Sequence, residues 1–214
     1  MATTKVSRNP EEVIVPRQEI VGMLEKHQVP WKSWGAPGTT SRTLHDFFKY
    51  HETDRLYLRN GAHGKNGSSD KFIIDVHAAI VIVMHRINRK WLELYEDRQV
   101  FDDNPEPLIR SGFNGIAETA KRTETMSETA KRCVTEELKF ADPSKYEMSE
   151  CVKIEHREIA PSEKWPGVWA AYHRHIFECV ISRQLFLPDG YVEREGIRTI
   201  YFKWKQLNQS ELRV

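Results

Sequence analysis

The stretch from Phe72 to Met84, FIIDVHAAIVIVM, constrains the fold more than any other part of the chain. It is long and rich in β-branched residues, which is typical of a strand buried on both faces of a sheet. Lys90–Tyr95, KWLELY, follows after a short turn and predicts a strand paired with the first. The sequence therefore predicts a sheet built around this hairpin.

Three later segments predict that the sheet continues toward the C-terminus. They alternate apolar with polar residues or are rich in aromatic and β-branched side chains. They are Cys151–Ile159, Ala170–Ile181 and Arg198–Trp204. His173 and His175 lie two apart in the second of them and are expected on one face. Two such histidines can bind a transition metal, but without a partner in sequence polar packing is the favoured interpretation.

The first third of the chain has a different character. It predicts two short helices, one within residues 13–26 and one from about Leu44, and a loop rich in Gly, Asn and Ser at residues 60–70. Trp31 and Trp34 flank the loop between the helices, and we interpret them as packing residues. We therefore predict an N-terminal extension of helices and loops at residues 1–69 and a second domain at residues 70–214.

Composition and charge argue against several functional classes. Thirty-two basic and 31 acidic residues balance, which gives no argument for a nucleic-acid or anionic-membrane partner. No apolar run reaches the length of a membrane span, and the N-terminal MATTKVSRNPEE lacks the apolar segment of a signal peptide. Cys133, Cys151 and Cys179 are odd in number and form no Cys-x-x-Cys pair, which predicts reduced thiols and a cytoplasmic location.

The stretch ETMSETAKRCVTEELKF, residues 124–140, predicts an amphipathic helix that carries several carboxylates. Thr125 and Glu128 have the spacing of a capping box, so the helix is expected to begin near Met126. Its apolar stripe consists of Met126, Ala130, Cys133, Val134 and Leu138. Residues 115–122 are expected to form the loop before it. Taken alone, this pattern fits a surface helix with ordinary ion pairs.

The same residues also resemble a known motif. Glu124, seven residues, Arg132, then Val134, the pair Glu136-Glu137 and finally Phe140 stand at the spacing of the Nudix box, so the chain resembles the Nudix hydrolase superfamily over residues 70–207. The box is degenerate at three positions. The family has Glu, Gly and Gly where this chain has Cys133, Lys139 and Glu118.

The resemblance implies a fold, a reaction and a cofactor. The fold is an α/β/α sandwich with a mixed β-sheet, closed by the strand at Arg198–Trp204 and a short helix at residues 205–207. The reaction is hydrolysis of a diphosphate linkage in a nucleoside-diphosphate-linked small molecule. The cofactor is Mg²⁺ or Mn²⁺, because divalent cations neutralise the diphosphate and help to activate water.

Residue by residue, the resemblance also implies a site. Glu136 and Glu137 would bind the metal, Arg132 would orient one of these carboxylates, and Glu124 would orient the loop or the helix. The third ligand of the family falls on Cys133, and a thiol is a poor ligand for Mg²⁺. We interpret Cys133 as a small core residue.

A replacement for the lost ligand is available nearby in sequence. Glu118 or Glu128 could supply the oxygen, and the carboxylates of Glu136, Glu137 and one of these two would then converge on one point. Arg98 and Gln99 stand where relatives carry substrate-contacting residues, although a solvated turn fits this position equally well.

Two hypotheses remain open at this stage. One is an active metal-dependent hydrolase acting on a small-molecule diphosphate. The other is a catalytically lapsed Nudix-fold binding or regulatory protein, which the changes at Cys133, Glu118 and Lys139 would explain. RNA binding ranks well below both. The extension could cover the core of its own chain or of a partner, which leaves a homodimer open.

Overall fold

The computed structural model describes residues 14–36, 41–54, 56–59, 71–109 and 115–208. The chain forms two units, one of residues 1–76 and 158–171 and one of residues 77–157 and 172–214. The first unit therefore takes in a segment from the second half of the chain, in addition to the predicted extension. None of the helices in the described ranges has the length and apolar character needed to cross a membrane.

The first unit contains the helices α1 (Arg17–Lys26), η1 (Trp31–Ser33) and α2 (Leu44–Thr53) and the strands β1 (Leu56–Arg59) and β8 (Ala160–Pro161). Thr43 caps α2 in a complete capping box with Asp46. Trp34 is buried and its ring lies 5.5 Å from that of Phe47, which in turn lies 5.1 Å from that of Trp165. Packing is thus the role of Trp34, and the segment around Trp165 completes this aromatic core.

The second unit contains most of the sheet and one α-helix among its described residues. Its strands are β2 (Phe72–Ile87) and β9 (Val168–Ile181), which both begin in the first unit, followed by β3 (Lys90–Phe101), β4 (Asn104–Leu108), β5 (Ile116–Thr119), β6 (Tyr146–Met148), β7 (Lys153–His156), β10 (Tyr191–Glu195) and β11 (Arg198–Gln206). The helices are α3 (Met126–Leu138) and the short η2 (Pro143–Lys145).

The strand order in this unit is β10-β11-β3-β2-β9-β6, with β4 on β3, β5 on β2 and β7 on β9. β10, β11, β3 and β2 pair antiparallel in turn. β2 and β9 run in the same direction, because His77 contacts His175 and His85 contacts Ile181 further along both strands. The sheet is therefore mixed, and the predicted α/β class with a mixed sheet is confirmed.

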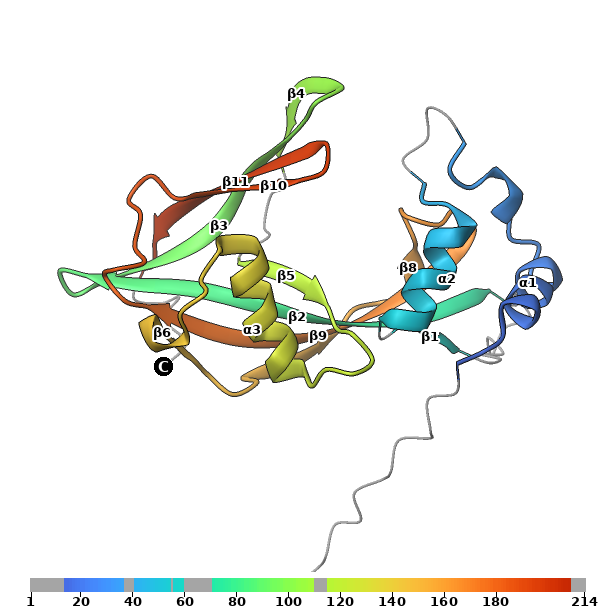
Figure 1. The fold of residues 1–214 in the computed structure, drawn as a ribbon, viewed down its shortest axis with the longest axis horizontal. Helices are drawn as coiled ribbons and strands as arrows, with labels where there is room; N and C mark the ends of the chain where they lie inside the picture. Colours follow the sequence, from blue (N-terminus) through green and yellow to red (C-terminus); the bar gives the residue numbers. More distant parts are fainter. Residues whose placement is uncertain (1–13, 37–40, 55, 60–70, 110–114, 209–214) are drawn as a thin grey trace, which may run out of the picture. The chain divides into compact units, whose positions relative to one another are not determined.

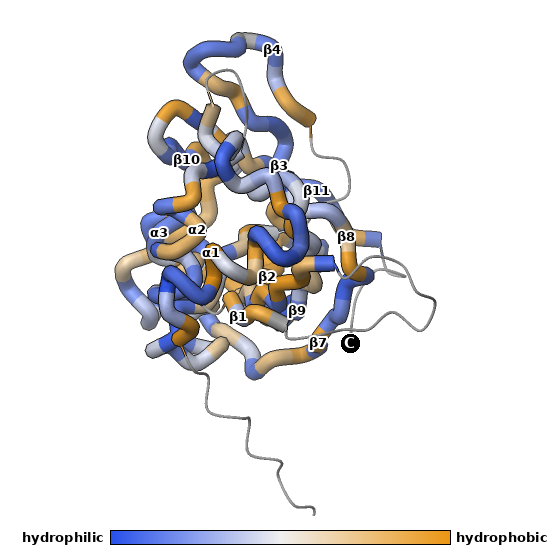
Figure 2. The backbone as a smooth tube through the Cα atoms, turned by 90° about the vertical axis from the view of Figure 1, so that its right-hand side faces the viewer, coloured by the Kyte–Doolittle hydropathy of each residue, from blue (hydrophilic) through white to orange (hydrophobic). Residues whose placement is uncertain are grey.

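Helix α3 packs its apolar stripe on one face of this sheet (Figure 1). Ala130, Cys133, Val134 and Leu138 are buried there against residues that alternate along β2, such as Val81 and Val83. In Figure 2, orange marks the hydrophobic residues along β2. The predicted stripe and the predicted buried strand therefore meet in one core.

Four local predictions need correction. Residues 116–119, expected in a loop, form β5, which pairs with residues 78–81 of β2. Lys205 and Gln206, expected in a short helix, continue β11, and Leu207 N donates to Trp91 O at 2.9 Å. Residues 96–99, for which a turn was one option, belong to β3. Residues 104–108, within a turn-rich region, form β4.

These errors share a physical cause. Each concerns a short segment or a strand end whose conformation depends on pairing with a distant strand rather than on its own periodicity. Gly115 illustrates the pairing at β5, because its φ is 88° and a Cβ atom would lie 2.3 Å from Val81 O. Only glycine lets the backbone approach β2 this closely.

Candidate functional site

Arg132 on α3 is the centre of the predicted constellation. Its Nε donates to Glu124 Oε1 at 2.9 Å and its Nη1 donates to Glu136 Oε2 at 2.9 Å. Its Nη2 donates to Thr119 O at 2.8 Å and to Glu124 Oε2 at 3.1 Å. Glu118 joins the same guanidinium through an Oε2–Nη1 distance of 3.5 Å. Three carboxylates from the loop, the helix and β5 thus share one half-buried arginine, which we call the Arg132 cluster.

Arg132 favours the charged form of Glu124. Burial by itself would raise the pKa of Glu124, but the hydrogen bonds and charge of Arg132 outweigh it and the pKa is lowered. Thr129 Oγ1 also donates to Glu124 Oε2 at 3.1 Å. Burial would lower the pKa of Arg132, yet Glu124 and Glu136 raise it. Arg132 therefore positions Glu124 and Glu136, as the resemblance implied, and is a permanent cation.

Glu137, the next residue, belongs to a different environment. Desolvation is the main cause that raises the pKa of its carboxyl group, to about 9, followed by a hydrogen bond with Glu193 and the charges of Glu193, Glu118 and Glu195. Glu193 is 8% exposed, and its Oε2 is buried without a hydrogen-bond partner. We call Glu137 and Glu193 the carboxylate pair.

Strand register explains how Glu193 reaches this face of the sheet. Glu193 on β10 is the partner of Ile200 on β11, and Ile200 is the partner of Gln99 on β3. Partners across a sheet share a face. Ile200 packs in the core with Cys133 and Val134 of α3, so Glu193 lies on the face that α3 covers. Sequence reasoning missed Glu193, although Gly196 between two charged, alternating segments is a hairpin signal.

Cys133 is a core residue, as predicted. It is fully buried and not in a disulfide. Burial raises the pKa of its thiol well above the ordinary value, and the charges of Glu137 and Glu118 add to this effect. A neutral thiol in an apolar core does not bind Mg²⁺.

The expected convergence of Glu136, Glu137 and either Glu118 or Glu128 is not observed. Within the described ranges, no three side chains of His, Cys, Asp or Glu are grouped so as to hold a metal ion. Glu128 accepts hydrogen bonds from Thr125 N at 2.7 Å and Thr125 Oγ1 at 2.9 Å, which confirms the predicted capping box. Glu136 and Glu118 are held by Arg132. The acidic residues of the helix therefore have different partners: Glu128 caps its first turn and Glu136 pairs with Arg132.

Arg98 and Gln99 point to opposite faces of β3. Gln99 is buried on the α3 face, where its Nε2 donates to Glu96 Oε1 at 2.8 Å. Arg98 stacks on Tyr201, with 4.2 Å between its Cζ and the ring centroid, and pairs with Asp97 at 2.5 Å. A ligand bound over α3 could therefore meet only Gln99 of these two.

Lys139 lies at a position of α3 where glycine would be favoured. It is the residue that ends α3, and it adopts a left-handed conformation with φ 62° and ψ 30°. Glycine is the usual residue for this helix-ending conformation, because a Cβ atom makes it unfavourable. Here a lysine occupies it, and its Nζ donates to Glu136 O at 2.5 Å.

The structure also gathers histidines that the sequence left apart. His77 Nδ1 and His175 Nε2 lie 3.4 Å apart, and His156 Nδ1 and His173 Nδ1 lie 2.7 Å apart. The rings of His77 and His173 stack at 4.7 Å. These four residues come from β2, β7 and β9. Among the described residues no three side chains of His, Cys, Asp or Glu are grouped so as to hold a metal ion. The contacts seen between these histidines are ring stacking and nitrogen–nitrogen contacts.

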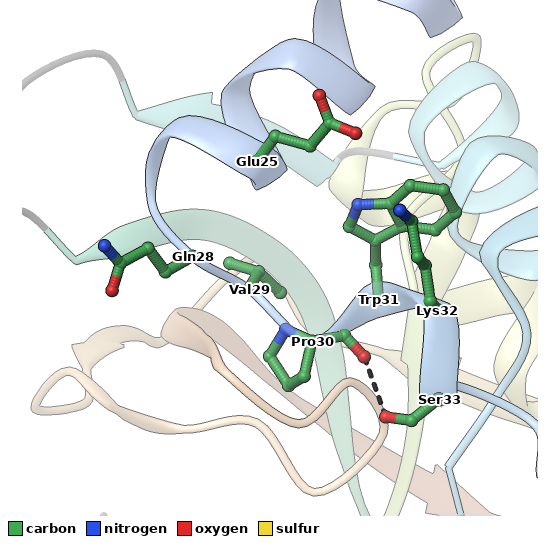
Figure 3. Close-up of a pocket in the computed structure, with 7 residues that line it drawn as sticks. All are labelled: Glu25, Gln28, Val29, Pro30, Trp31, Lys32 and Ser33. Atoms are coloured by element: carbon green, nitrogen blue, oxygen red, sulfur yellow. Dashed lines mark hydrogen bonds between the residues drawn. The ribbon is translucent and has the colours of Figure 1, made fainter.

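A pocket of about 370 Å³ lies in the first unit, between the end of α1 and η1 (Figure 3). Its lining includes Glu25, Gln28, Trp31 and Lys32. Lys32 Nζ lies 5.4 Å from the ring centroid of Trp31, so the pocket combines an aromatic face with charges of both signs. None of the predicted site residues contributes to it.

Comparison with known proteins gives two solved structures of interest. The C. elegans Ap4A hydrolase is 14% identical, with a TM-score of 0.33, covering 60% of this chain and 78% of its own. The NUDIX domain of Shewanella oneidensis NrtR, solved with ADP ribose, is 10% identical, with a TM-score of 0.34, covering 67% of this chain and 77% of its own.

No family model matches the chain. No curated protein matches it either.

Proposed function

We propose that this chain is a Nudix-type, metal-dependent hydrolase that cleaves a diphosphate linkage in a nucleoside-diphosphate-linked or related small molecule. The cofactor would be Mg²⁺ or Mn²⁺. One observation carries the proposal. Glu136 and Glu137 are adjacent on α3, yet Arg132 holds the first while the second faces a buried carboxylate. A purely structural helix has no need of such a pair, which costs folding free energy.

The residues present fit a divalent cation. The carboxyl groups of Glu137 and Glu193 offer hard oxygen donors, and Oε2 of Glu193 has no hydrogen-bond partner in the described part of the chain. A bound cation would relieve the repulsion between these two groups. Mg²⁺ needs only one or two carboxylates when substrate phosphates and waters complete its shell, so a cage of three protein ligands is not required. When bound, the cation would neutralise the diphosphate and lower the pKa of a water molecule.

The chain's own residues would then have distinct roles. Glu137 would hold the cation, and burial on the α3 face would keep bulk water away from it. Arg132 would keep Glu136 and Glu124 in fixed positions rather than contact the substrate, because its donors are already used by protein oxygens. Glu136, half exposed beside the pair, is the carboxylate best placed to accept a proton from the surroundings.

A second candidate is the catalytically lapsed binding or regulatory protein. The observation that favours it is Cys133, which is buried, neutral and in the position of a lost ligand. In this case the carboxylate pair would be a shared-proton hydrogen bond with no cation.

The two candidates are separated by a hydrolysis screen over nucleoside-diphosphate derivatives with Mg²⁺ and with Mn²⁺. We expect turnover by the wild type and a loss of at least about 100-fold in Glu137→Gln, the usual consequence of disturbing a metal site. Glu147→Gln, exposed on β6, is the matched control and should retain full turnover. Absence of turnover in the wild type, together with no effect of either cation on its melting temperature, would favour the lapsed protein.

A further inference from the structure

Glu193 is the most unusual buried group in the second unit. Charged carboxylates are seldom buried without a cationic partner, because desolvation costs several kcal/mol. Glu193 is 8% exposed and its Oε2 lacks a hydrogen-bond partner. Its neighbour in space is another acid, Glu137, rather than a base. The hydrogen bond with Glu137 therefore leaves one oxygen of Glu193 without a partner among the residues that the structure describes.

The nearby basic side chains already form ion pairs with other acids. Arg132 is shared by Glu118, Glu124 and Glu136. Arg198, on the second strand of the hairpin, pairs with Glu195. Arg194 pairs with Asp102 at 2.7 Å. None of these contacts brings positive charge to Glu193, whose Oε2 has no hydrogen-bond partner within the described ranges and is open to a bound cation.

The position of Glu193 matches the loss at Cys133. Cys133 and Glu137 are one turn apart on α3, and both face the sheet side on which Glu193 lies. β10 contacts α3 directly. A carboxylate from the sheet can thus occupy the space next to Glu137 that a carboxylate at position 133 of the helix would otherwise reach.

We propose that Glu193 of β10 replaces the acidic ligand missing from α3, so that Glu137 and Glu193 together bind the divalent cation. This inference rests on the proposed function and assigns its metal site to a helix–strand pair instead of to one helix. Substrate phosphates would complete the coordination. The ligand that the family carries at position 133 of the helix would then be supplied by the sheet, and Cys133 can serve as a core residue.

The test measures cation binding separately from turnover. Mn²⁺ is titrated into the full chain, and the EPR signal of free Mn²⁺ reports the fraction bound. We expect Glu193→Gln and Glu137→Gln each to weaken binding by at least about tenfold, and Glu147→Gln to leave it unchanged. Glu193→Asp keeps the charge on a shorter side chain and should bind with intermediate affinity.

Melting temperatures in EDTA provide the second measurement. Glu193→Gln removes one of two repelling acids, so without a cation it should melt no lower than the wild type, while the stabilisation by Mn²⁺ is lost. Binding by Glu193→Gln equal to the wild type, with Glu137→Gln impaired, would overturn the role of Glu193 and leave the proposed function intact. Absence of Mn²⁺ binding by the wild type would overturn both.

Discussion

Glu136 and Glu137 are consecutive residues of one helix, yet they belong to opposite electrostatic environments. Glu136 extends to Arg132 and lies half exposed in the Arg132 cluster. Glu137 turns toward the sheet and forms the carboxylate pair with Glu193. Arg132 lowers the pKa of Glu124 in the first region, whereas burial and like charge raise the pKa of Glu137 in the second. In the first region every acid pairs with a base, and in the second two acids lie together with no basic partner among the described residues.

This difference separates positioning from binding. In the Arg132 cluster every acid has a partner, so it fixes the geometry of α3, β5 and the loop between them. The carboxylate pair keeps an unsatisfied oxygen and is the part with the capacity to bind. Substitutions in the two regions should therefore have different signatures.

The largest effect is expected from restoring the acid of the family at position 133. Cys133→Glu would place a third carboxyl group in a fully buried position beside Glu137 and Glu118. We expect a loss of about 4 kcal/mol or more in the free energy of unfolding, measured by urea denaturation. Cys133→Ala, the control for volume, should lose about 1–2 kcal/mol. Equal stability of Cys133→Glu and the wild type in EDTA would contradict the buried description of this site.

A second large effect is expected in the Arg132 cluster. Arg132→Met keeps much of the side-chain volume but leaves Glu118, Glu124 and Glu136 without their shared cation. We expect about 3 kcal/mol of destabilisation, because three partly buried acids lose the cation that they share. Arg157→Met, at a site outside the cluster, is the control and should stay within about 0.5 kcal/mol of the wild type in the same urea titration.

The pH dependence of stability should reveal the carboxylate pair. The pKa of Glu137 is raised in the folded state, so between pH 4.5 and about 9 the unfolded chain binds fewer protons than the native one. Its contribution to stability is therefore complete below pH 4.5 and is lost as pH rises through about 9. Glu124 behaves in the opposite way, since its lowered pKa gives stability that is lost only at acidic pH.

We expect the free energy of unfolding in EDTA to fall by on the order of 2 kcal/mol between pH 5 and pH 8 for this reason. Glu137→Gln should reduce that slope, and the difference between the two curves isolates the contribution of this residue. A saturating divalent cation should also flatten the curve of the wild type. Parallel curves for the variant and the wild type would show that Glu137 is ionised normally.

The smallest effect is expected at the end of α3, which both regions share. Lys139→Gly relieves a left-handed conformation that costs a residue with a Cβ atom about 1 kcal/mol. We expect a gain of this size in the free energy of unfolding with no change in Mn²⁺ affinity. Lys139→Ala keeps the strain and serves as the control. A change in affinity with Lys139→Gly would indicate that the helix end shapes the carboxylate pair.

The Arg132 cluster could largely be read from the sequence. Thr125 and Glu128, Arg132 and Glu136, and Glu124 with Arg132 all lie within about two turns of one helix and its lead-in. Contacts at such short separations follow from helical geometry and capping, which are local properties. The buried strand at Phe72–Met84 and the stripe through Cys133 could be predicted for the same reason, because periodicity reports which side of an element is apolar.

The carboxylate pair was decided by the tertiary structure alone. β5 and β10 are short, so their sequences do not distinguish a strand from a turn. They form strands because neighbouring strands supply the hydrogen bonds. The strand register places Glu193 opposite Ile200 and on the face of the sheet that α3 covers. The sequence by itself thus determined a capped, acidic helix on a sheet. Only folding, which desolvates two distant acids together, decided which of its carboxylates is available to a cation.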